Sequence, residues 1–421
     1  MVLGALFVFE KSIPKIREIF SPFFLLSLVS QFPFPISSHM MKKLLLLILG
    51  LCLLVSCTLA REIDDDLVKA CEDNDFAKVV DLLDKKRARV NYANGFGQTA
   101  LLFASQRNNT EMIKFLVSRG ANVNFADYGW GNTPLIWACG KKNLEIVKLL
   151  VSRGANVKHI NRRGSSALSW AALKNHLEIV KILVRKGANV NYAIPKDKVT
   201  PLISAAGNNN LEMVRYLVNR GAKIDHVDKD GQTALVSASE KNHLEVVKFL
   251  VEKGADVNHT FKDGWNALIL ASEKNNLNVV KFLVEKGADV NHPDKDNRTA
   301  LIYASYNNHL EVVKFLVENG ADVNAADVDG WTALIEASHN NNVQVVEFLA
   351  ASGADLDHAD DDGDTALFHA AYHENGAEIL RILAESGANW NIVNKDGKTA
   401  LDYASEMMKE MVRDFHISKS N

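Results

Sequence analysis

Leu244-Glu-Val-Val-Lys-Phe-Leu-Val-Glu-Lys-Gly254 decides the fold, because this stretch returns with few changes at residues 277–287 and 310–320. A triplet similar to Thr-Ala-Leu recurs with the same spacing of 33 or 34 residues. Its ten copies begin at Thr99, Thr133, Ser166, Thr200, Thr233, Asn266, Thr299, Thr332, Thr365 and Thr399. A fixed period of this length indicates a repeat architecture, in which one structural unit is copied along the chain.

Each copy predicts a pair of short helices, as in residues 233–240 and 244–253. An Asn usually separates the two helices, at positions 108, 175, 209, 242, 275, 308 and 341. A Gly follows the second helix, at positions 120, 154, 187, 221, 254, 287, 320, 353 and 387. Both residue types tolerate the left-handed conformation that ends a helix. The polar turn after each Gly, as at Asp327 to Gly330, predicts a hairpin-like β-turn.

The second helix of each copy is apolar on two sides. One face carries Leu244, Val247, Leu250 and Val251, and another carries Val246 and Phe249. A single unit cannot bury both faces, whereas a unit stacked between two neighbours can. The sequence therefore predicts a solenoid, whose stability is approximately a sum over the interfaces between repeats.

These residues resemble the ankyrin-repeat family over residues 65–415. The family's triplet and helix exit are matched by Thr133-Pro-Leu, Thr200-Pro-Leu and Gly254-Ala-Asp-Val-Asn258. The resemblance implies an all-α solenoid of about eleven stacked helix-turn-helix units, joined by β-turn or hairpin loops. One departure is systematic, because the family's His after the triplet is replaced. The residues in its place are Leu102, Ile136, Ser169, Ile203, Val236, Ile269, Ile302, Ile335 and Phe368. We therefore expect apolar packing to replace the side-chain network that this His makes in the family.

The ends of the repeat array are predicted to be caps. Asp64, Asp65 and Asp66 stand where the beginning of a helix favours acidic residues. At the other end, residues 401–415 predict a polar-faced helix with no exit turn. The predicted organisation is 1–39, a start site assigned too early or a disordered extension; 40–57, a signal peptide; 58–63, a spacer; 64–96, an N-terminal capping repeat; 97–396, nine central repeats; 397–416, a C-terminal capping repeat; and 417–421, a tail.

The segment after Met40 has the features of an export signal. Met40-Met41-Lys42-Lys43 precedes the apolar run 44–55, which is short for a span across a bilayer. The following Leu54-Val55-Ser56-Cys57 resembles the lipobox of bacterial lipoproteins, and this resemblance implies lipidation at Cys57. Ordinary cleavage after Ala60 and an uncleaved membrane anchor are the alternatives. We therefore expect an exported protein of the bacterial cell envelope, lipid-anchored or periplasmic.

Composition agrees with a binding protein rather than a general nucleic-acid binder. The chain has a formal net charge of −3, and without residues 1–56 the remaining 43 basic and 49 acidic residues give −6. A nucleic-acid binder would carry an evident excess of basic residues. The four cysteines are too few for a disulfide framework, and Cys71 and Cys139 are interpreted as small buried side chains.

No catalytic or metal-binding constellation is evident in the sequence, so we expect no enzyme activity, cofactor or metal. Five histidines recur at the repeat spacing, namely His159, His226, His259, His292 and His358. Neighbouring units should lie about 8–10 Å apart, whereas each ligand of a shared zinc lies about 2 Å from the metal. We interpret these residues as solvated turn histidines, and His176, His243 and His309 as structural. The acidic turn at 360–364 lacks the spacing of a calcium loop.

The resemblance implies that a protein partner docks on a concave face formed by the turn tips and the first helices. The predicted partner-binding residues are Trp130, Arg163, Lys174, Lys229, Lys262, Trp265, Lys274, Tyr306, Trp331, His339 and Tyr372. Trp130, Trp265 and Trp331 are predicted anchors, since Trp, Tyr and Arg often dominate binding energy. The alternative is that each folds back on an adjacent turn. Trp137 and Trp170 are predicted to pack in the core between units.

The predicted function is that of a monomeric, non-catalytic protein-interaction scaffold of the cell envelope. Its membrane contact would be limited to an N-terminal lipid anchor or signal segment. Two alternatives remain, a secreted effector that binds host proteins and an enzyme or metal protein within the repeats.

Overall fold

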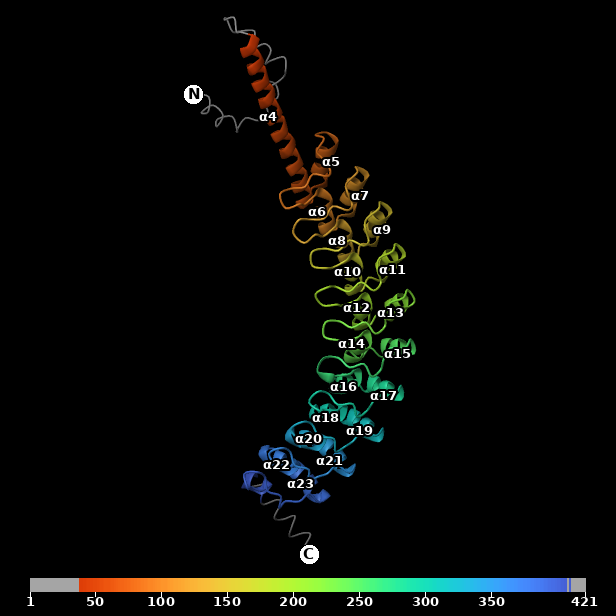
Figure 1. The fold of residues 1–421 in the computed structure, drawn as a ribbon, viewed down its shortest axis with the longest axis vertical. Helices are drawn as coiled ribbons and strands as arrows, with labels where there is room; N and C mark the ends of the chain where they lie inside the picture. Colours follow the sequence, from red (N-terminus) through yellow and green to blue (C-terminus); the bar gives the residue numbers. More distant parts are fainter. Residues whose placement is uncertain (1–37, 407–408, 410–421) are drawn as a thin grey trace, which may run out of the picture. The chain divides into compact units, whose positions relative to one another are not determined.

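A computed structural model describes residues 38–406 and 409 of the chain (Figure 1). Its regular structure is helical in this range, apart from three isolated antiparallel bridges, Ala93 with Thr99, Ile160 with Ser166 and Ala326 with Thr332. The chain divides into two compact units, Met1–Gly129 and Trp130–Asn421. The predicted all-α class is confirmed, with the helix pairs from α4 and α5 onward matching the predicted units.

The first unit contains α4 (Ser38–Glu72), α5 (Phe76–Asp84), α6 (Ala100–Arg107) and α7 (Thr110–Ser118). The second half of α4 packs against α5 and α6, and it buries Leu67 and Cys71. The expectation that Asp64 begins a helix is wrong, because α4 is continuous and includes residues 58–63. Asp64 is buried instead, where its carboxylate accepts hydrogen bonds from the backbone N–H of Arg89 at 2.6 Å and from Arg89 Nε at 2.7 Å.

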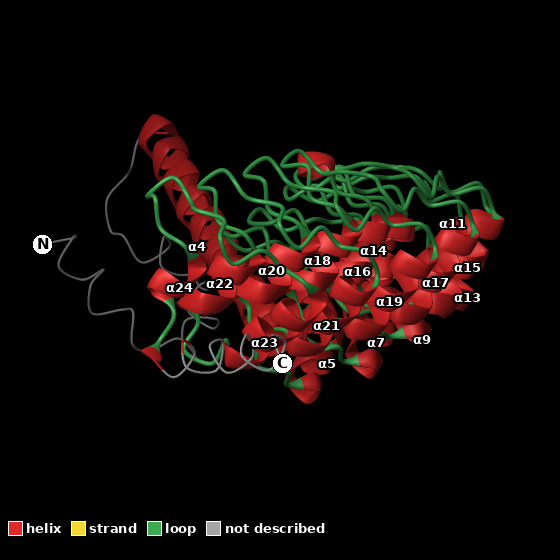
Figure 2. Ribbon diagram, turned by 90° about the horizontal axis from the view of Figure 1, so that it is seen from below, coloured by secondary structure: helices red, strands yellow, loops and turns green. Residues whose placement is uncertain are grey.

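The second unit repeats the helix pair along its length. Its elements are α8 (Pro134–Gly140), α9 (Leu144–Ser152), α10 (Ala167–Leu173), α11 (Leu177–Arg185), α12 (Pro201–Gly207), α13 (Leu211–Val218), α14 (Ala234–Glu240), α15 (Leu244–Glu252), η2 (Lys262–Gly264), α16 (Ala267–Glu273), α17 (Leu277–Glu285), α18 (Ala300–Tyr306), α19 (Leu310–Glu318), α20 (Ala333–His339), α21 (Val343–Ala351), α22 (Ala366–Tyr372), α23 (Ala377–Ser386) and α24 (Ala400–Tyr403). Within this unit the first helices form one layer and the second helices another, and the connecting loops gather on one side (Figure 2).

The predicted helix ends are confirmed. The triplet Thr is the N-cap of the first helix, where for example Thr233 Oγ1 accepts from the backbone N–H of Val236 at 3.3 Å. Asn242 ends the first helix with φ 59°, and Gly254 follows the second helix with φ 91°. The same left-handed φ recurs at every Asn and Gly position named above. In the N-terminal capping repeat Arg87 takes this conformation, with φ 57°, at the position where the later repeats have Gly.

The core lies between successive helix pairs. Val246, Val247, Phe249 and Leu250 of α15 are buried, which confirms that two sides of the second helix are covered. The residues that replace the His after the triplet are also buried, and eight of these nine are apolar. Packing therefore replaces the side-chain network, as predicted. Small residues such as Ala238, which is fully buried, allow neighbouring first helices to approach closely.

Polar links join each turn of the second unit to the next. The first turn residue caps its own turn, and Asp327 Oδ1 accepts from the N–H groups of Asp329 and Trp331 at 3.0 and 2.8 Å. The N–H of Val328 donates to the carbonyl of Asp296 in the preceding turn at 3.0 Å. Equivalent bonds between turns start from the N–H groups of Arg162, Lys229, Lys262, Lys295, Asp361 and Lys395.

The periodic histidines contribute to these links. His159, His259, His292 and His358 each donate from Nε2 to the carbonyl of a turn glycine in the preceding unit, at 2.8 to 3.0 Å. His226 donates in the same way to the carbonyl of Lys198 at 2.9 Å. The interpretation of these residues as merely solvated is therefore corrected, because a ring that reaches a fixed backbone oxygen joins two units. The second set, His176, His243 and His309, contacts carbonyls near the ends of earlier first helices, which confirms its structural role.

The C-terminal cap differs from the expected helix. α24 ends at Tyr403, and Ala404 is extended with φ −67° and ψ 144°, so residues 401–415 do not begin as one continuous helix. Most of the remainder lies outside the described residues. Residues 1–37, which make up nearly all of the segment 1–39 predicted to be a start site assigned too early or a disordered extension, lie outside them as well. Within the described ranges, no helix combines the length and the apolarity that crossing a membrane requires.

The left-handed break between the helices supplies a first prediction. Asn242→Ala should lower the free energy of unfolding by about 1 kcal/mol, since a non-Gly residue without a helpful polar side chain is strained at this φ. Asn242→Gly should leave stability nearly unchanged, because Gly has no Cβ penalty there. Urea unfolding followed by circular dichroism measures both. Equal losses in the two variants would show that the side chain, and not the backbone conformation, matters.

Candidate functional site

The candidate site is a surface that we call the turn-side face, formed by the turn tips and the exposed side of the first helices of the second unit. Nine of the predicted partner-binding residues are exposed on it, namely Trp130, Arg163, Lys174, Lys229, Lys262, Lys274, Tyr306, His339 and Tyr372. The side chains of Trp130, Tyr306 and Tyr372 are the large aromatic ones among them, with 51%, 51% and 46% exposure.

The other two predicted anchors, Trp265 and Trp331, are only partly exposed. Trp265 packs on Tyr303 of the next unit, with 4.7 Å between ring centroids. Trp331 packs on His339 at 5.0 Å and on His369 of the next unit at 4.5 Å. Each ring thus has an intramolecular partner on a first helix, and part of each ring stays accessible for a ligand.

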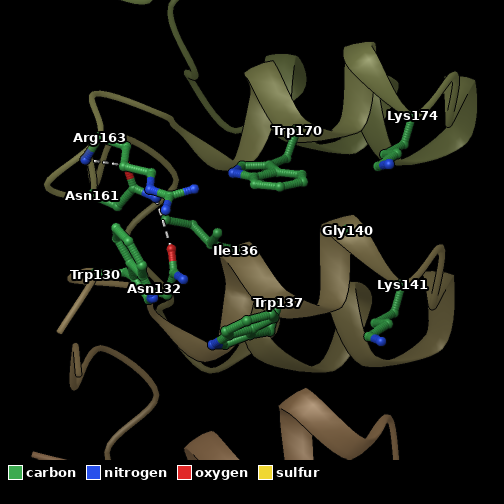
Figure 3. Close-up of a pocket in the computed structure, with 10 residues that line it drawn as sticks. All are labelled: Trp130, Asn132, Ile136, Trp137, Gly140, Lys141, Asn161, Arg163, Trp170 and Lys174. Atoms are coloured by element: carbon green, nitrogen blue, oxygen red, sulfur yellow. Dashed lines mark hydrogen bonds between the residues drawn. The ribbon is translucent and has the colours of Figure 1, made fainter.

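A pocket of about 380 Å³ lies at the early end of this face. Three tryptophans line it, Trp130 from a turn tip and Trp137 and Trp170 from the same position of α8 and α10. Figure 3 shows the two helical indoles on successive helices, with Trp130 at one end of the pocket. The expectation that Trp137 and Trp170 belong to the core is corrected, because both are only partly buried and line this pocket.

The geometry of the pocket follows from the repeat. Trp137 and Trp170 each follow the triplet Thr or Ser by four residues, so the 3.6-residue helical period places both on the side of the turns. Gly140 also lines the pocket, and a Cβ at this position would be in ordinary van der Waals contact with the Trp170 ring at 3.8 Å. The indole Nε1 of Trp170 is shielded and has no hydrogen-bond partner, a state that costs about 1–3 kcal/mol.

The charged residues of the pocket are all basic. Arg163 lies over the Trp130 ring, 3.5 Å from its centroid, and Lys141 and Lys174 stand at the ends of α8 and α10 (Figure 3). The polar floor is formed by Asn132 and Asn161, whose side chains are hydrogen-bonded at 2.8 Å. No carboxylate lines the pocket.

The late end of the turn-side face has the opposite charge, and two of its carboxylates, those of Asp360 and Asp364, are buried and already have partners. Asp360 Oδ2 accepts from His369 Nε2 at 2.8 Å, and both side chains are buried. Asp364 accepts from the hydroxyl of Tyr372 at 2.8 Å and from Asn394 Nδ2 at 2.8 Å. Burial and the bond to Asp364 together raise the pKa of Tyr372.

Glu336 of α20 is the most perturbed carboxyl of the face. It is buried with 5% exposure, and desolvation raises its pKa to about 7 despite the attraction of Arg298. Arg298 itself donates from Nε to Asp327 at 3.1 Å. Desolvation and the neighbouring histidines lower the pKa of His339. These groups form a packed polar region rather than an open cleft.

Sequence reasoning missed the row of residues four positions after the triplet. In the second unit this row reads Trp137, Trp170, Ser204, Ser237, Leu270, Tyr303, Glu336, His369 and Tyr403. The Leu two positions after the triplet residue and the Ala five positions after it are constant in these copies, so the variation between them was the signal that could have identified the row. Trp137 and Trp170 were interpreted as core because this first-helix position usually packs between units, which does hold for Ser237, Leu270, Glu336 and His369 of the same row.

Metal and thiol chemistry find little support among the described residues. No group of three or more His, Cys, Asp or Glu side chains there could hold a metal ion. Burial raises the pKa of Cys71 to about 12 and raises that of Cys139 as well, so both thiols are unreactive at neutral pH. Cys57 is exposed on α4.

Comparisons with known proteins identify the repeats. The sequence matches the family model for ankyrin repeats (3 copies) over residues 67–161, 130–194, 168–261, 205–294, 258–327, 291–360, 324–394 and 353–415. The chain therefore belongs to the ankyrin-repeat family. The crystal structure of the human ASB11 ankyrin repeat domain is similar, with 28% sequence identity and a TM-score of 0.45, over 49% of this chain and 93% of that chain. No curated protein matches the sequence.

Membership of this family implies a scaffold for protein–protein interaction, and the fold is typically non-catalytic. On this chain the turn-side face carries the varied residues, and the second helices and turn links carry the copied ones.

The buried carboxyl of Glu336 supplies a second prediction. Its folded-state pKa of about 7 exceeds the ordinary value of 4.5, so the folded protein holds this proton more tightly than the unfolded chain. The stability that it contributes is present below pH 4.5 and is lost as pH rises through 7. Between pH 5 and 8 the free energy of unfolding should fall by about 2–3 kcal/mol more in the wild type than in Glu336→Gln.

Urea unfolding at several pH values measures this difference. Glu318→Gln, which changes an exposed carboxylate at the end of α19, is the control and should keep the wild-type pH dependence. If Glu336→Gln also keeps it, Glu336 is not the titrating group.

Proposed function

We propose that this ankyrin-repeat protein binds a protein partner stoichiometrically through the turn-side face. The observation that carries the proposal is that the turn tips and the ends of the first helices expose side chains that differ from copy to copy, whereas the buried positions of the repeat are nearly constant. Large aromatic side chains are among the exposed ones, including Trp130, Tyr306 and Tyr372. Turn tips and helix ends have no core to fill, so exposed aromatic rings there are available as anchors.

Charge supports a directional contact along this face. Lys174, Lys229 and Lys274 are exposed in the early and middle repeats, whereas Asp361 and Asp362 are in the late repeats. A partner with the opposite arrangement of charge would be steered into one orientation. We infer that the protein acts as a monomer and without catalysis, since the perturbed groups of the face are engaged in packing with one another.

We further propose that the protein is exported to the bacterial cell envelope and anchored by a lipid on Cys57. The support is the lipobox-like Leu54-Val55-Ser56-Cys57 after a short apolar run, together with the exposure of Cys57. A secreted effector that binds host proteins is the alternative, and it requires release rather than tethering. Tethering requires a lipid on Cys57, whereas release requires that Cys57 carries none.

A third prediction tests the face. Lys262→Ala, Lys274→Ala and Tyr306→Ala, combined in one variant, should reduce the partner recovered by affinity purification from native cells at least about fivefold. Because all three side chains are exposed, thermal unfolding should change little. The matched control combines Lys248→Ala, Lys281→Ala and Lys314→Ala on the second helices, away from the turns. An equal loss in both variants would contradict binding by the turn-side face.

A fourth prediction tests the anchor. The native cell should incorporate a labelled fatty acid into the wild-type protein, and Cys57→Ala should abolish the label, because the thiol is the acceptor. Cys71→Ala is the control and should keep the label, since this buried thiol belongs to α4 but not to the lipobox-like motif. A wild-type protein that takes up no label and is found only in the medium would support the secreted alternative, whereas label retained in Cys57→Ala would show that Cys57 is not the acceptor.

A further inference from the structure

We propose that the three-tryptophan pocket between α8 and α10 binds an extended peptide segment in which carboxylates flank a bulky apolar side chain. This inference rests on the proposed function, and it names the chemistry that one part of the turn-side face recognises. The occupant to which we commit is an acidic-aromatic segment of a partner protein.

The apolar half of this preference comes from the indoles. Trp130, Trp137 and Trp170 face a common hollow of about 380 Å³, which is near the lower end of the ~300–1,000 Å³ of typical ligand pockets. A hollow of this size accommodates one or two large side chains and not a folded element. Aromatic rings that face one another also favour edge or offset contact with a further ring. The pocket therefore selects a Phe, Tyr, Trp or Leu side chain.

The acidic half comes from the cations around the hollow. Arg163 at one end, and Lys141 and Lys174 at the other, surround it without any lining carboxylate (Figure 3). Within the described chain neither Lys141 nor Lys174 takes part in an ion pair, whereas Lys274, at the same position of α16, pairs with Glu273 at 3.2 Å. A guanidinium stacked on an indole can still donate to a carboxylate in its own plane. Carboxylates on both sides of the apolar residue would therefore meet a cation.

The pocket differs from the packed polar region at the late end of the face, where the buried carboxylates already have partners. At the late end, Asp360 pairs with His369, and Asp364 accepts from Tyr372. Trp265 and Trp331 are occupied by packing against the next repeat. The pocket also holds the unpartnered indole N–H of Trp170, which a peptide carbonyl could satisfy after a small movement of the ring. A peptide offers this acceptor at every residue.

A single-stranded nucleic acid would also combine negative charge with rings, but the structure favours a peptide. Nucleic-acid grooves track several phosphates along a basic surface. Here three cations surround one hollow, and the chain carries a net charge of −3. The family's scaffold function points to a protein in addition.

The test uses fluorescein-labelled 12-residue peptides and the full chain, with binding followed by fluorescence anisotropy. One peptide alternates Glu with Phe, one alternates Glu with Ser, and one alternates Lys with Phe. The Glu–Phe peptide should bind at least about tenfold more tightly than either of the others, because only it satisfies both halves of the preference. The oligonucleotide dT12 should bind more weakly than the Glu–Phe peptide.

Two charge-matched variants localise the site. Arg163→Glu with Lys174→Glu should weaken binding of the Glu–Phe peptide at least about tenfold. Lys241→Glu with Lys395→Glu changes the net charge equally, at an exposed first-helix end and an exposed turn of later repeats, and should weaken it less than about twofold at 0.15 M salt. Circular dichroism melting should show both variants folded. A third variant, Trp137→Leu, leaves the net charge unchanged and should also weaken binding of the Glu–Phe peptide.

Several results would overturn the inference. Equal weakening in the two charge variants would show general electrostatics, and equal binding of the Glu–Ser peptide would show that the hollow is not used. Tighter binding of dT12, lost in Arg163→Glu with Lys174→Glu, would assign the pocket to nucleic acid. One outcome is that the variant Arg163→Glu with Lys174→Glu recovers the partner protein as well as the wild type does, while the variant with Lys262→Ala, Lys274→Ala and Tyr306→Ala does not. In that case the proposed function stands and the pocket inference fails.

Discussion

Mutual burial between neighbouring helix pairs is the constraint on which the second unit depends. A helix of nine residues such as α15 buries Val246, Val247, Phe249 and Leu250, which a lone pair of helices could not cover on all sides. Isolated helices of this length are marginal in water, so their stability must come from packing. Each interface then requires nearly the same residues as the previous one. This requirement explains why the sequence repeats, and it leaves few positions free to vary.

Polar contacts fix the register of this packing. Some of them could be predicted from the sequence and others could not. The Asn and Gly helix ends were predicted from sequence because a left-handed residue is a local requirement that one residue type reveals. The hydrogen bonds made by His259 and His292 were not predicted from sequence, because each ring contacts a carbonyl 28 residues earlier in the chain. Only the stacked arrangement brings those atoms within 3.0 Å. Local signals thus gave the elements, and the contacts between units required the structure.

The site was less predictable than the fold for a related reason. Exposed residues at turn tips, such as Trp130, follow directly from the repeat register, and the structure agrees that this side chain is accessible. Trp137 and Trp170 were assigned to the core because their position on the first helix usually packs between units. Their partial exposure became visible only in the structure, where both line a pocket together with Trp130 from a turn tip. The continuous helix α4 was also missed, because the acidic residues at 64–66 were interpreted as the beginning of a helix. Asp64 instead accepts a hydrogen bond from Arg89.

The two ends of the turn-side face show how one framework can hold different recognition chemistry. In the late repeats, polar side chains and carboxylates are hydrogen-bonded to one another, as Tyr372 is to Asp364, so these carboxylates already have partners. In the early repeats, indoles and cations share a hollow that no carboxylate lines. Neither arrangement alters the buried rows that hold the repeats together. Specificity can therefore change at residues 137, 163 or 174 while the stack is preserved, since none of these three side chains belongs to the fully buried rows between helix pairs.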